Sequence, residues 1–452
     1  MNNAIILAAG KGSRMKTSIP KCAITILGKP MIEYVIEAVK TSVEKTICVV
    51  GAKKEVFLEL LSNRVVFAMQ EEQLGTAHAV KCALPYITDE NGFSLILSGD
   101  VPFVDSNLIQ EIIDYHLKED ADITVVTTNV SNPFGYGRIV RDKKNHIVGI
   151  VEEKEATDQQ KKINEINAGI YCVKNTVLKQ LINQMPIHLS TNEYYLTDLI
   201  EACSGVVLGY PVSDSFKVQG MNDLIQLSNL ETEFRKRIIL NHLKKGVRMI
   251  HADSILIGSD VEIESGVTIY PGSILLGKTK IQSGAIIGPN TEINNSIIEE
   301  NVVCRHSVVS DSCIQKDSTI GPFAHIRMNS VIGPANRIGN FVELKNTILG
   351  EHCKASHLSY IGDTEGGKNI NFGCGSITVN YDGKVKHKTE IGDGVFIGCN
   401  SNLIAPIHLA SHCYIAAGST ITDDLEEKDF AIARVKQLTK KKYAGKYHQK
   451  LD

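Results

Sequence analysis

Branched aliphatic residues recur at every sixth position through most of the second half of the chain. The first run comprises Ile257, Ile263, Ile269, Leu275, Ile281, Ile287 and Ile293, and the second, after a slip of three residues, comprises Val302, Val308, Ile314, Ile320, Ile326, Ile332, Ile338 and Leu344. A third run comprises Ile391, Ile397, Leu403, Leu409, Ile415 and Ile421. A period of six matches neither an α-helix nor a simple strand. It is typical of a solenoid whose short strands each turn one large side chain inward, and it predicts a parallel β-helix over residues 247–452.

The first half of the chain has a different pattern, in which short apolar runs alternate with segments of helical spacing. The apolar runs are Ala4–Ala8, Thr46–Val50, Val65–Met69, Ser94–Ser98 and Ile123–Thr127, and the helical segments are Met31–Val43, Glu55–Ser62, Ala77–Leu84 and Asn107–Leu117. This alternation predicts a doubly wound, Rossmann-like α/β domain over residues 1–223, with ligands at the carboxyl ends of its strands.

A single helix is predicted between these two domains. Leu224–Lys245 carries apolar residues near helical spacing among charged ones, and Gly246 ends the pattern. We therefore assign residues 224–246 to a connecting helix, which would span about 30 Å at 1.5 Å per residue and hold two sites apart.

Length and composition add limits to this picture. The chain has 452 residues, 43% of them hydrophobic and 22% charged, and a net charge of −3, which argues against a nucleic-acid or anionic-membrane partner. The N-terminus has no basic segment typical of a signal peptide, and no apolar run approaches the ~20 residues of a membrane span. We expect a cytoplasmic protein whose eleven cysteines are free thiols. Scattered His352, Cys353 and His357 do not have the paired spacing of a zinc site.

The loop after the first apolar run is a candidate phosphate-binding loop. Residues 10–15 read Gly-Lys-Gly-Ser-Arg-Met, and glycines in such a loop let backbone N–H groups approach phosphate oxygens. Lys11, Arg14 and Lys21 supply positive charge. The loop is neither a Walker A motif nor a G-x-G-x-x-G motif. The longer form LAAGKGSRM, followed by Pro20-Lys21, resembles the signature of the sugar-phosphate nucleotidyltransferases.

Polar residues follow two of the later apolar runs. Gln70 and the run Gln73-Leu74-Gly75-Thr76 place amides and bare backbone where a base edge could pair with them. Asp100 follows another run, and a carboxylate at the end of a strand is well placed for a divalent metal. A lone aspartate there is more often a turn or helix-cap residue, but the loop at residues 10–15 favours the functional interpretation.

Four further motifs extend the resemblance. They are Gly135-Tyr136-Gly137-Arg138, Ile150-Val151-Glu152-Glu153-Lys154, Ile166-Asn167-Ala168-Gly169-Ile170 and Gly220-Met221-Asn222-Asp223. In this order after LAAGKGSRM, and from about residue 3 to residue 437, the chain resembles the bifunctional UDP-N-acetylglucosamine pyrophosphorylase / glucosamine-1-phosphate N-acetyltransferase of bacteria, which serves peptidoglycan synthesis.

The resemblance implies a uridylyl-transfer site in the first half of the chain. Its substrates would be UTP and N-acetylglucosamine-1-phosphate, and Mg²⁺ would be held by Asp100 and Asn222. The residues that it assigns to UTP or the UDP-sugar are Leu7, Ala8, Ala9, Gly10, Lys11, Gly12, Arg14, Lys21, Gln70, Gln73, Gly75, Thr76, Gly137, Glu152, Asn167 and Asn222. Attack of a sugar-phosphate oxygen on the α-phosphorus requires alignment and charge neutralisation more than an acid or base. Ser98 departs from the tyrosine of some members.

Polar residues cluster between the second and third aliphatic runs, where we expect acyl-transfer chemistry. A lone histidine in a solenoid is usually a surface residue, but His357-Leu358-Ser359-Tyr360, followed by Asn380-Tyr381-Asp382-Gly383, resembles the acetyltransferase site of the same family. An imidazole, whose ordinary pKa is about 6.5, suits a general base that takes a proton from an amine. We therefore predict that His357 is the base that activates glucosamine-1-phosphate toward acetyl-CoA.

The same resemblance assigns the other residues of this second site. It implies that the sugar phosphate is bound by Arg327, Lys345, Tyr360 and Asn371, and acetyl-CoA by Cys374, Asn380, Tyr381, Cys399, Ala417 and Arg434. Three positions depart from the family pattern: Cys374 replaces a common Ala, Cys399 a common Ser, and Gly366 a usual inward Ile whose loss could leave a gap. The tail from Lys436 to Lys450 holds six lysines and is either a solvated end or a contact for the CoA phosphates. The resemblance also implies that the β-helix of hexapeptide repeats is left-handed, which the period alone does not give, and that the chain forms a homotrimer through it.

Two alternatives stay open at this point. A nucleotidyltransferase-like domain joined to hexapeptide coils also occurs in regulatory subunits, which have no need of Lys21, Asp100, Asn222 and His357 together. An enzyme with one activity, such as a sugar-1-phosphate nucleotidyltransferase with a structural β-helix, has no need of His357 or the Asn380-Tyr381 loop.

Overall fold

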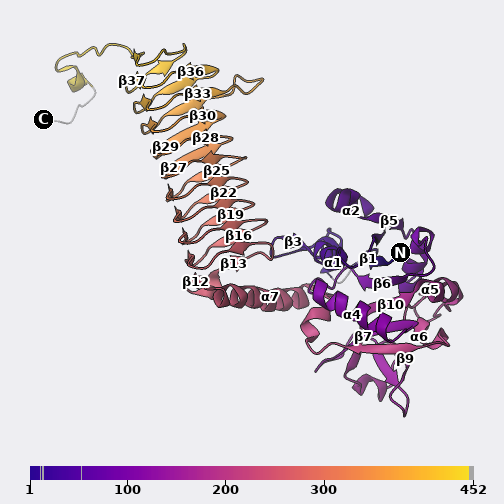
Figure 1. Ribbon diagram of the computed structural model, residues 1–452. Coiled ribbons are helices and arrows are strands. Elements are labelled where there is room, and N and C mark those ends of the chain that lie inside the picture. The colour runs from indigo at the N-terminus through magenta and orange to yellow at the C-terminus, as the bar shows by residue number, and fades with distance from the viewer. Residues whose placement is uncertain (11, 13–14, 52, 447–452) are drawn as a thin grey trace. The chain divides into compact units, whose positions relative to one another are not determined.

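The structure is a computed structural model that describes residues 1–10, 12, 15–51 and 53–446. It divides into two compact units, Met1–Glu233 and Phe234–Asp452, whose boundary falls inside helix α7 (Leu224–Lys244). The N-terminal unit is built on a mixed sheet covered by helices, and the C-terminal unit is a stack of short strands (Figure 1).

The sheet of the N-terminal unit has the strand order β11-β7-β10-β6-β1-β4-β5. After β1 the chain adds β4 and β5 on one side and then returns to place β6 on the other side, which is the doubly wound arrangement. The strands are β1 (Asn3–Leu7), β4 (Lys45–Val50), β5 (Val66–Met69), β6 (Phe93–Ser98), β7 (Ile123–Asn129), β8 (Arg138–Arg141), β9 (Ile147–Val151), β10 (Glu165–Lys174) and β11 (Val207–Pro211), with a separate hairpin of β2 (Thr25–Ile26) and β3 (Lys29–Pro30).

Helices cover both faces of this sheet, which explains why its central strands are apolar throughout. Ile6 of β1 packs in the core with residues of α1, α2 and α4, whereas Ile5 faces the core that contains residues of α3, α5 and α6. The side chain of Asp105 caps α4 by accepting a hydrogen bond from the Leu108 amide at 2.8 Å. The helices are α1 (Met31–Val39), α2 (Lys54–Leu61), α3 (Thr76–Ala83), α4 (Ser106–Lys118), α5 (Asn175–Leu181) and α6 (Asp198–Ala202).

One part of this sheet has no counterpart in the sequence prediction. β10 lies antiparallel between β6 and β7, and its register shifts between Asn167 and Tyr171. The hairpin of β8 and β9 joins β10 at the Ile166–Arg138 pair. The predicted motifs around Gly137, Glu152 and Asn167 therefore lie on or beside antiparallel strands.

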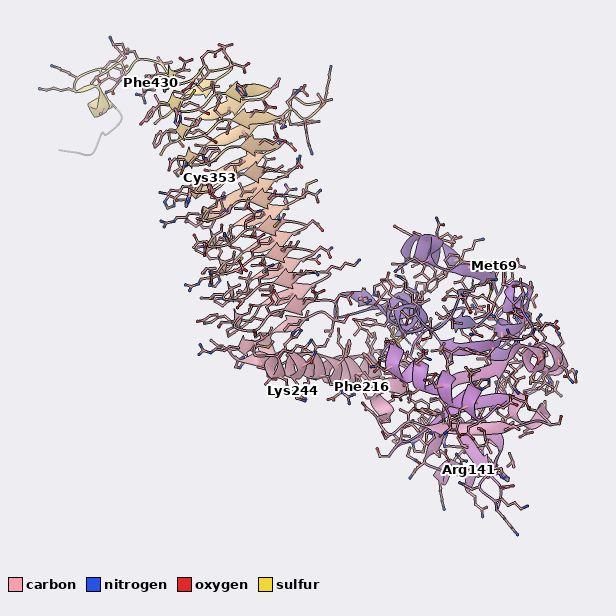
Figure 2. The ribbon with its side chains drawn as sticks, viewed as in Figure 1. Met69, Arg141, Phe216, Lys244, Cys353 and Phe430 are labelled. Atoms are coloured by element: carbon pink, nitrogen blue, oxygen red, sulfur yellow. The ribbon has the colours of Figure 1, made fainter. Side chains whose placement is uncertain are left out.

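Helix α7 begins and ends close to the predicted bounds. Its last turn closes with two hydrogen bonds of 3.1 Å, from the Val247 amide to the His242 carbonyl and from the Gly246 amide to the Leu243 carbonyl. Gly246 adopts φ +88°, the left-handed conformation that this terminating motif requires. Lys244 marks the end of the helix in Figure 2.

The C-terminal unit is a three-faced parallel β-helix, as predicted. The first face contains β12 (Arg248–Met249), β15 (Thr268–Ile269), β18 (Ile286–Ile287), β21 (Val303–Cys304), β24 (Thr319–Ile320), β31 (Asn371–Phe372), β34 (Phe396–Ile397), β37 (Tyr414–Ile415) and β39 (Phe430–Ala431). The second contains β13 (Leu256–Ile257), β16 (Ile274–Leu276), β19 (Glu292–Asn294), β22 (Val308–Ser310), β25 (His325–Arg327), β32 (Ile377–Val379), β35 (Asn402–Ile404) and β38 (Thr420–Ile421). The longer strands β27 (Arg337–Lys345) and β29 (Lys354–Gly362) run through both faces.

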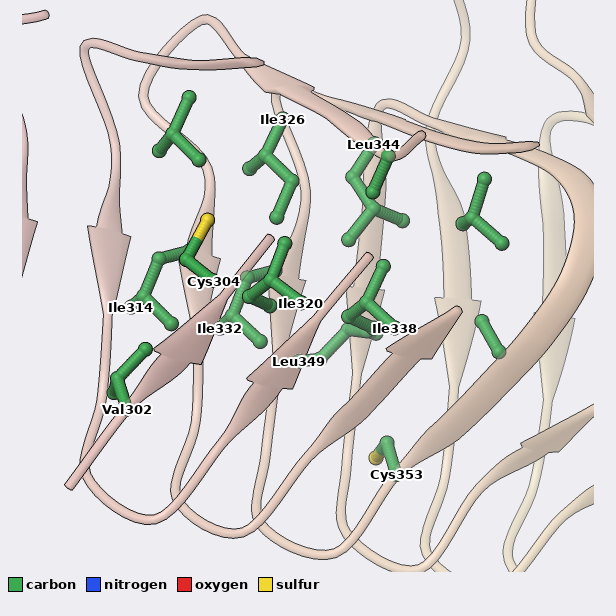
Figure 3. Packing of buried hydrophobic residues seen from close by; sticks show 14 of the residues in the cluster. Val302, Cys304, Ile314, Ile320, Ile326, Ile332, Ile338, Leu344, Leu349 and Cys353 are labelled. Carbon is green, nitrogen blue, oxygen red and sulfur yellow. The ribbon is translucent and has the colours of Figure 1, made fainter. Parts of the chain in front are cut away.

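The third face is a separate nine-stranded sheet, so each complete coil contributes three strands. It contains β14 (Glu262–Ile263), β17 (Lys280–Ile281), β20 (Ile297–Ile298), β23 (Cys313–Ile314), β26 (Val331–Ile332), β28 (Ile348–Leu349), β30 (Thr364–Gly366), β33 (Thr389–Ile391) and β36 (Ile407–Leu409). Figure 3 shows the inward side chains from successive coils packed along the axis, among them Ile314, Ile320 and Ile326.

The predicted second run is confirmed at Val302, which is fully buried, but is wrong at Val308. Val308 is 38% exposed, and the inward position belongs to its neighbour Val309, which is fully buried, as is Cys304. The chain makes five-residue steps from Ile293 to Ile298, from Cys304 to Val309 and from Val309 to Ile314 instead of one slip of three. Each short step turns on a left-handed residue, namely Asn295, His306 and Asp311, all at φ 47°.

The β-helix also continues through the segment that separates the second and third aliphatic runs. Leu349, Ala355, Ile361 and Phe372 point into the same core, so the repeat is masked by short steps and smaller residues rather than interrupted. Gly366 leaves no simple gap, because a Cβ there would lie 2.8 Å from Ile370 Cδ1 and 2.9 Å from Leu349 Cδ2. Neighbouring side chains therefore occupy the space that an isoleucine would fill.

Candidate functional sites

The carboxyl ends of the central parallel strands bring the first set of predicted residues to one edge of the sheet. Leu7 pairs with Val49 on one side and with Ser98 on the other. The Ala8 amide donates to the Val49 carbonyl and the Gly99 amide to the Leu7 carbonyl, each at 2.9 Å. The loop that begins at Ala8 and the turn that carries Asp100 therefore leave the sheet side by side. The predicted phosphate contacts Lys11 and Arg14 lie outside the described residues.

Lys21, Asp100 and Asn222 meet at one point. The Lys21 ammonium donates to Asp100 Oδ2 and, at 3.1 Å, to Asn222 Oδ1. Gly12 makes this position possible, because it adopts φ +59° and a Cβ there would lie 2.9 Å from Lys21 Cβ. One cation already contacts both predicted metal-ligand oxygens, so the geometry of the pair fits a small cation.

The donor set also bears on which metal fits. Among the described residues, no group of three or more His, Cys, Asp and Glu side chains is arranged to hold a metal ion. Asp100 and Asn222 offer two oxygen donors and no sulfur or imidazole. A site with few protein oxygens, completed by water and phosphate, is the kind that Mg²⁺ favours.

The loop predicted to bind a nucleobase is held by hydrogen bonds to its own backbone and to the phosphate loop. Gln70 is buried and its Nε2 donates to the Gly75 carbonyl at 3.0 Å. Gln73 Nε2 donates to the Ala9 carbonyl at 2.6 Å. The two predicted parts of a nucleotide site are therefore joined by Gln73.

The segment from Tyr194 to Leu196, which the sequence prediction did not identify, forms hydrogen bonds with the end of this loop at Leu74 and Thr76. The Tyr194 amide donates to the Leu74 carbonyl at 2.8 Å, and the Leu196 amide donates to Thr76 Oγ1 at 2.9 Å. Gly75 adopts φ +99° and a Cβ on it would lie 2.5 Å from the Tyr194 carbonyl oxygen. Tyr194 and Leu196 contact the loop through their backbone groups. Such contacts do not depend on residue type, so no sequence motif marks these two positions.

The residues predicted to hold the sugar, Gly137, Glu152 and Asn167, form a second cluster. The Asn167 amide donates to the Gly137 carbonyl at 2.9 Å, and a Cβ on Gly137 would lie 3.6 Å from Glu152 Oε1. Thr197 Oγ1 donates to the same carboxylate oxygen at 3.4 Å. Burial raises the pKa of Glu152, with nearby Glu155 and Asp198 adding to that effect.

In the β-helix, the predicted base and three predicted acetyl-CoA residues share one corner. Asn340 pairs with His357, and the pairs on both sides of His357, Ala355 with Phe372 and Tyr360 with Ile377, keep the same offset. His357 is thus opposite Cys374. By the same reasoning Cys374 is opposite Cys399, and Cys399 is opposite Ala417. We call Asn340, His357, Cys374, Cys399 and Ala417 the corner column.

The first member of the corner column orients the predicted base. His357 Nδ1 lies 2.9 Å from Asn340 Oδ1, and an amide oxygen only accepts hydrogen bonds. Nδ1 must therefore carry the proton, which leaves the lone pair on Nε2. Sequence reasoning missed Asn340, which lies in the middle of strand β27.

Beside the corner column, the half-buried carboxylate of Asp363 accepts hydrogen bonds from one ammonium and two amide side chains. Asp363 accepts hydrogen bonds from Lys345 Nζ at 3.1 Å and from Asn346 Nδ2 at 2.7 Å, and also from Asn380 Nδ2. Burial raises the pKa of Asp363, but these hydrogen bonds outweigh it and hold the pKa below its ordinary value. Two predicted residues, Lys345 and Asn380, are therefore held by an aspartate that no motif identified.

A second lysine approaches Lys345. The Lys345 ammonium lowers the pKa of Lys386 by repulsion between like charges. Burial alone would lower the pKa of Lys345, but its contact with the Asp363 carboxylate raises it. The ammonium groups of Lys345 and Lys386 outnumber the single carboxylate of Asp363. The cluster therefore keeps a net positive charge that suits an anionic ligand. Lys386 lies in the loop at residues 380–388 that projects from the β-helix, three residues beyond the Gly383 that ends the quoted motif.

The remaining residues of this site lie on two faces of the β-helix. Arg327 pairs in register with Lys345 on the second face, where its guanidinium donates to Glu343 Oε1 at 2.6 Å. Tyr360 lies on the same face, and Asn380 Nδ2 is 3.4 Å from its hydroxyl. Asn371 lies on the first face, where it pairs with Phe396. The corner column separates it from the other three sugar-phosphate residues.

The far end of the corner column also carries predicted acetyl-CoA residues. Arg434 Nη1 donates to the Ala417 carbonyl at 2.6 Å, which places these two residues together. Tyr381 is exposed on the projecting loop, which Asp382 braces by accepting from the Lys384 and Val385 amides. The lysine-rich tail has a short 3₁₀ turn at Tyr443–Lys446, and its last predicted lysine, Lys450, lies outside the described residues.

Comparison with known proteins covers both units. Residues 3–205 match the nucleotidyl transferase family, and residues 388–423 match the bacterial transferase hexapeptide family of six repeats. No helix within the described residues is long and apolar enough to cross a membrane.

Several curated relatives match nearly the whole chain. The bifunctional protein GlmU of Acholeplasma laidlawii is 48% identical over 446 residues, which cover 98% of this chain and 97% of that protein. The GlmU proteins of Geobacillus sp. (strain WCH70) and Clostridium novyi are 45% and 43% identical, each over 98% of this chain and over 97% and 98% of their own lengths. Identity of this extent spans both the sheet at residues 3–205 and the β-helix, so the chain belongs to the family of the bifunctional protein GlmU.

Proposed function

We propose that this chain catalyses two successive reactions: it acetylates glucosamine-1-phosphate with acetyl-CoA, and it then transfers UMP from UTP to the resulting N-acetylglucosamine-1-phosphate. The products are UDP-N-acetylglucosamine and pyrophosphate. The observation that carries this proposal is the 48% identity with a bifunctional protein GlmU along 98% of the chain, because it includes both candidate sites.

Uridylyl transfer is assigned to the N-terminal unit. The loop from Gln70 to Thr76 holds the uridine, and Gly137, Glu152 and Asn167 hold the N-acetylglucosamine part. Lys21 contacts phosphate through its ammonium. The sugar-phosphate oxygen attacks the α-phosphorus of UTP and pyrophosphate leaves, so these residues act by alignment and by neutralising charge.

The family of nucleotidyl transferases uses a divalent metal, and we propose Mg²⁺ held by Asp100 and Asn222. When bound, such an ion neutralises charge on the phosphates and helps to align them. The support from this chain is that Asp100 Oδ2 and Asn222 Oδ1 both contact one cation, the Lys21 ammonium.

Acetyl transfer is assigned to the β-helix. His357 Nε2 takes a proton as the amine nitrogen of glucosamine-1-phosphate forms a bond with the acetyl carbon, the carbon–sulfur bond breaks, and CoA leaves as its thiol. Arg327, Lys345, Tyr360 and Asn371 bind the sugar phosphate, and Lys386 adds positive charge. Cys374, Asn380, Tyr381, Cys399, Ala417 and Arg434 line the groove for acetyl-CoA, and backbone N–H groups stabilise the oxyanion.

A homotrimer formed through the β-helix accounts for the division of the sugar-phosphate residues between two faces. Asn371 lies on the first face and Lys345 on the second, so the first face of one copy and the second face of a neighbour complete one site. Exposed Phe323 and Phe341 stack at 5.5 Å on the same side of the repeat, as expected for an apolar contact between copies. Light scattering after size-exclusion chromatography tests this assembly, which we place in the cytoplasm.

One incubation tests the two reactions together. The protein is mixed with glucosamine-1-phosphate, acetyl-CoA, UTP and Mg²⁺, and CoA, pyrophosphate and UDP-N-acetylglucosamine are measured over time. We expect CoA to precede pyrophosphate, and omission of acetyl-CoA to stop both. Pyrophosphate release from N-acetylglucosamine-1-phosphate without any CoA release from glucosamine-1-phosphate would reduce the protein to a single activity.

A further inference from the structure

Two of the eleven cysteines differ from the others in their surroundings. All eleven lie within the described residues and are free thiols, but Cys374 and Cys399 are the two that are exposed. Burial raises the pKa of Cys48 and of Cys304 to about 12, so these thiols stay protonated and unreactive near neutral pH. Thiol chemistry in this chain is therefore concentrated at the exposed pair.

The exposed pair occupies equivalent positions on neighbouring coils. The strand pairs before and after them, Phe372 with Ile397 and Ile377 with Asn402, keep one offset, which places Cys374 opposite Cys399. The Asn400 amide donates to the Cys374 carbonyl at 2.8 Å. Each cysteine is followed by a left-handed residue, Gly375 at φ 77° and Asn400 at φ 54°. Both side chains thus leave the same turn of the same corner.

The spacing of the coils is compatible with a disulfide. Neighbouring parallel strands lie about 4.8 Å apart. Cysteines joined by a disulfide have Cα atoms about 4.4–6.8 Å apart. The coils are also in close contact at this corner, since a Cβ on Gly373 would lie 2.5 Å from the Cys399 amide nitrogen. Rotation about the side-chain bonds, with a small adjustment of the corner, is enough to bring the two sulfurs together.

We propose that Cys374 and Cys399 form a reversible redox pair whose disulfide closes the acetyl-CoA groove. This inference rests on the proposed function, because it places the cofactor along the corner column. The bridge joins the two coils immediately beyond His357, and its sulfurs stand where the arm of acetyl-CoA lies. Acetyl transfer then depends on the thiol state of the protein, whereas uridylyl transfer does not.

The co-reactant is a low-molecular-weight disulfide. The thiolate of one cysteine attacks one sulfur of that disulfide, which forms a mixed disulfide and releases one small thiol. The thiolate of the other cysteine then displaces the second small thiol and forms the Cys374–Cys399 bond. The two cysteines are oxidised, the small disulfide is reduced to two thiols, and the two cysteine protons end on those thiols.

The test uses oxidised glutathione as the probe and the full chain as the protein. After oxidation and removal of the probe, peptide mass mapping should find the peptide containing Cys374 linked to that containing Cys399, lighter by two hydrogen atoms. Acetyl transfer should fall in proportion to the linked fraction and return on reduction with dithiothreitol. Uridylyl transfer from supplied N-acetylglucosamine-1-phosphate should stay unchanged in the same samples.

Two variants serve as matched controls. In the variant Cys374→Ala/Cys399→Ser, treatment with oxidised glutathione should not change the rate of acetyl transfer measured before treatment. The variant Cys82→Ser/Cys203→Ser lacks two partly exposed cysteines of the other unit, and its acetyl transfer should remain as sensitive to oxidised glutathione as that of the parent protein. Absence of the linked peptide, with acetyl transfer intact, overturns the redox pair and leaves the proposed function standing. A linked peptide without loss of acetyl transfer overturns the placement of acetyl-CoA along the corner column.

Discussion

Replacement of His357 tests the chemistry assigned to the β-helix. His357→Ala removes the group whose Nε2 lone pair is left free by the Nδ1 contact to Asn340 Oδ1 at 2.9 Å. General acid–base catalysis contributes about 10²–10⁴ to a rate, so we expect acetyl transfer to fall by that factor. Uridylyl transfer from supplied N-acetylglucosamine-1-phosphate should persist, because the residues assigned to that reaction all lie in the N-terminal unit.

Asn340→Ala should reduce acetyl transfer less than His357→Ala does, because it removes the residue that orients the base and not the base itself. It removes one exposed hydrogen bond, which contributes about 0.5–1.5 kcal/mol, and each 1.36 kcal/mol corresponds to about tenfold in rate. The expected fall in acetyl transfer is therefore about two- to tenfold, well short of the loss in His357→Ala.

The assay follows CoA release with glucosamine-1-phosphate as acceptor, in parallel with pyrophosphate release in the uridylyl reaction. Added imidazole should restore part of the acetyl transfer of His357→Ala and none of that of Asn340→Ala, because only the first variant lacks a base. Normal acetylation by His357→Ala would make His357 a structural residue. A base would then have to be sought in Tyr360 or in a water molecule.

Three other changes address separate parts of the structure. Asp100→Ala should abolish pyrophosphate release and leave CoA release intact, because the carboxylate acts only in the N-terminal unit; unchanged pyrophosphate release would remove Asp100 from the mechanism. Because burial raises the pKa of Glu152, that carboxylate gains its proton at a higher pH than an ordinary glutamate does. The KM for N-acetylglucosamine-1-phosphate should therefore rise as the pH falls toward that raised pKa, and Glu152→Gln should show no such rise. Gly366→Ala should lower the free energy of unfolding by about 1–3 kcal/mol through overpacking against Ile370 and Leu349; an unchanged urea midpoint would show that these side chains adjust freely.

The period-six pattern was enough to predict the β-helix, but not every coil of it. Five-residue steps at Asn295, His306 and Asp311 shift the inward position by one residue, so that Val309 and not Val308 is buried. A fixed period cannot follow such steps, because each depends on a left-handed corner. Asn, Asp and His tolerate that conformation, but left-handed Asn290 and Asn301 also stand within six-residue steps, so residue type alone does not locate the short steps.

The sequence motifs indicated those residues of the candidate sites that contact one another through side chains. Lys21, Asp100 and Asn222 come from distant motifs and meet at one point. Tyr194 and Leu196 were missed because they act through backbone hydrogen bonds, which leave no mark on residue type. Asp363 and Asn340 were missed for another reason: their partners lie one coil away, and the register of the coils is needed to pair them. Lys386 was missed because it lies in the loop at residues 380–388, outside the repeat.

The corner column has a consequence for how substitutions act on such a site. Asn340, His357, Cys374, Cys399 and Ala417 each belong to a different rung of one ladder, and in a solenoid each rung interacts mainly with its nearest neighbours. A substitution on one rung therefore alters the chemistry at one position along the axis of the β-helix and leaves the other rungs in place. Two successive rungs of this chain carry cysteine, so a pair of thiols stands on one corner of a coil stack whose strand pairing continues through both rungs.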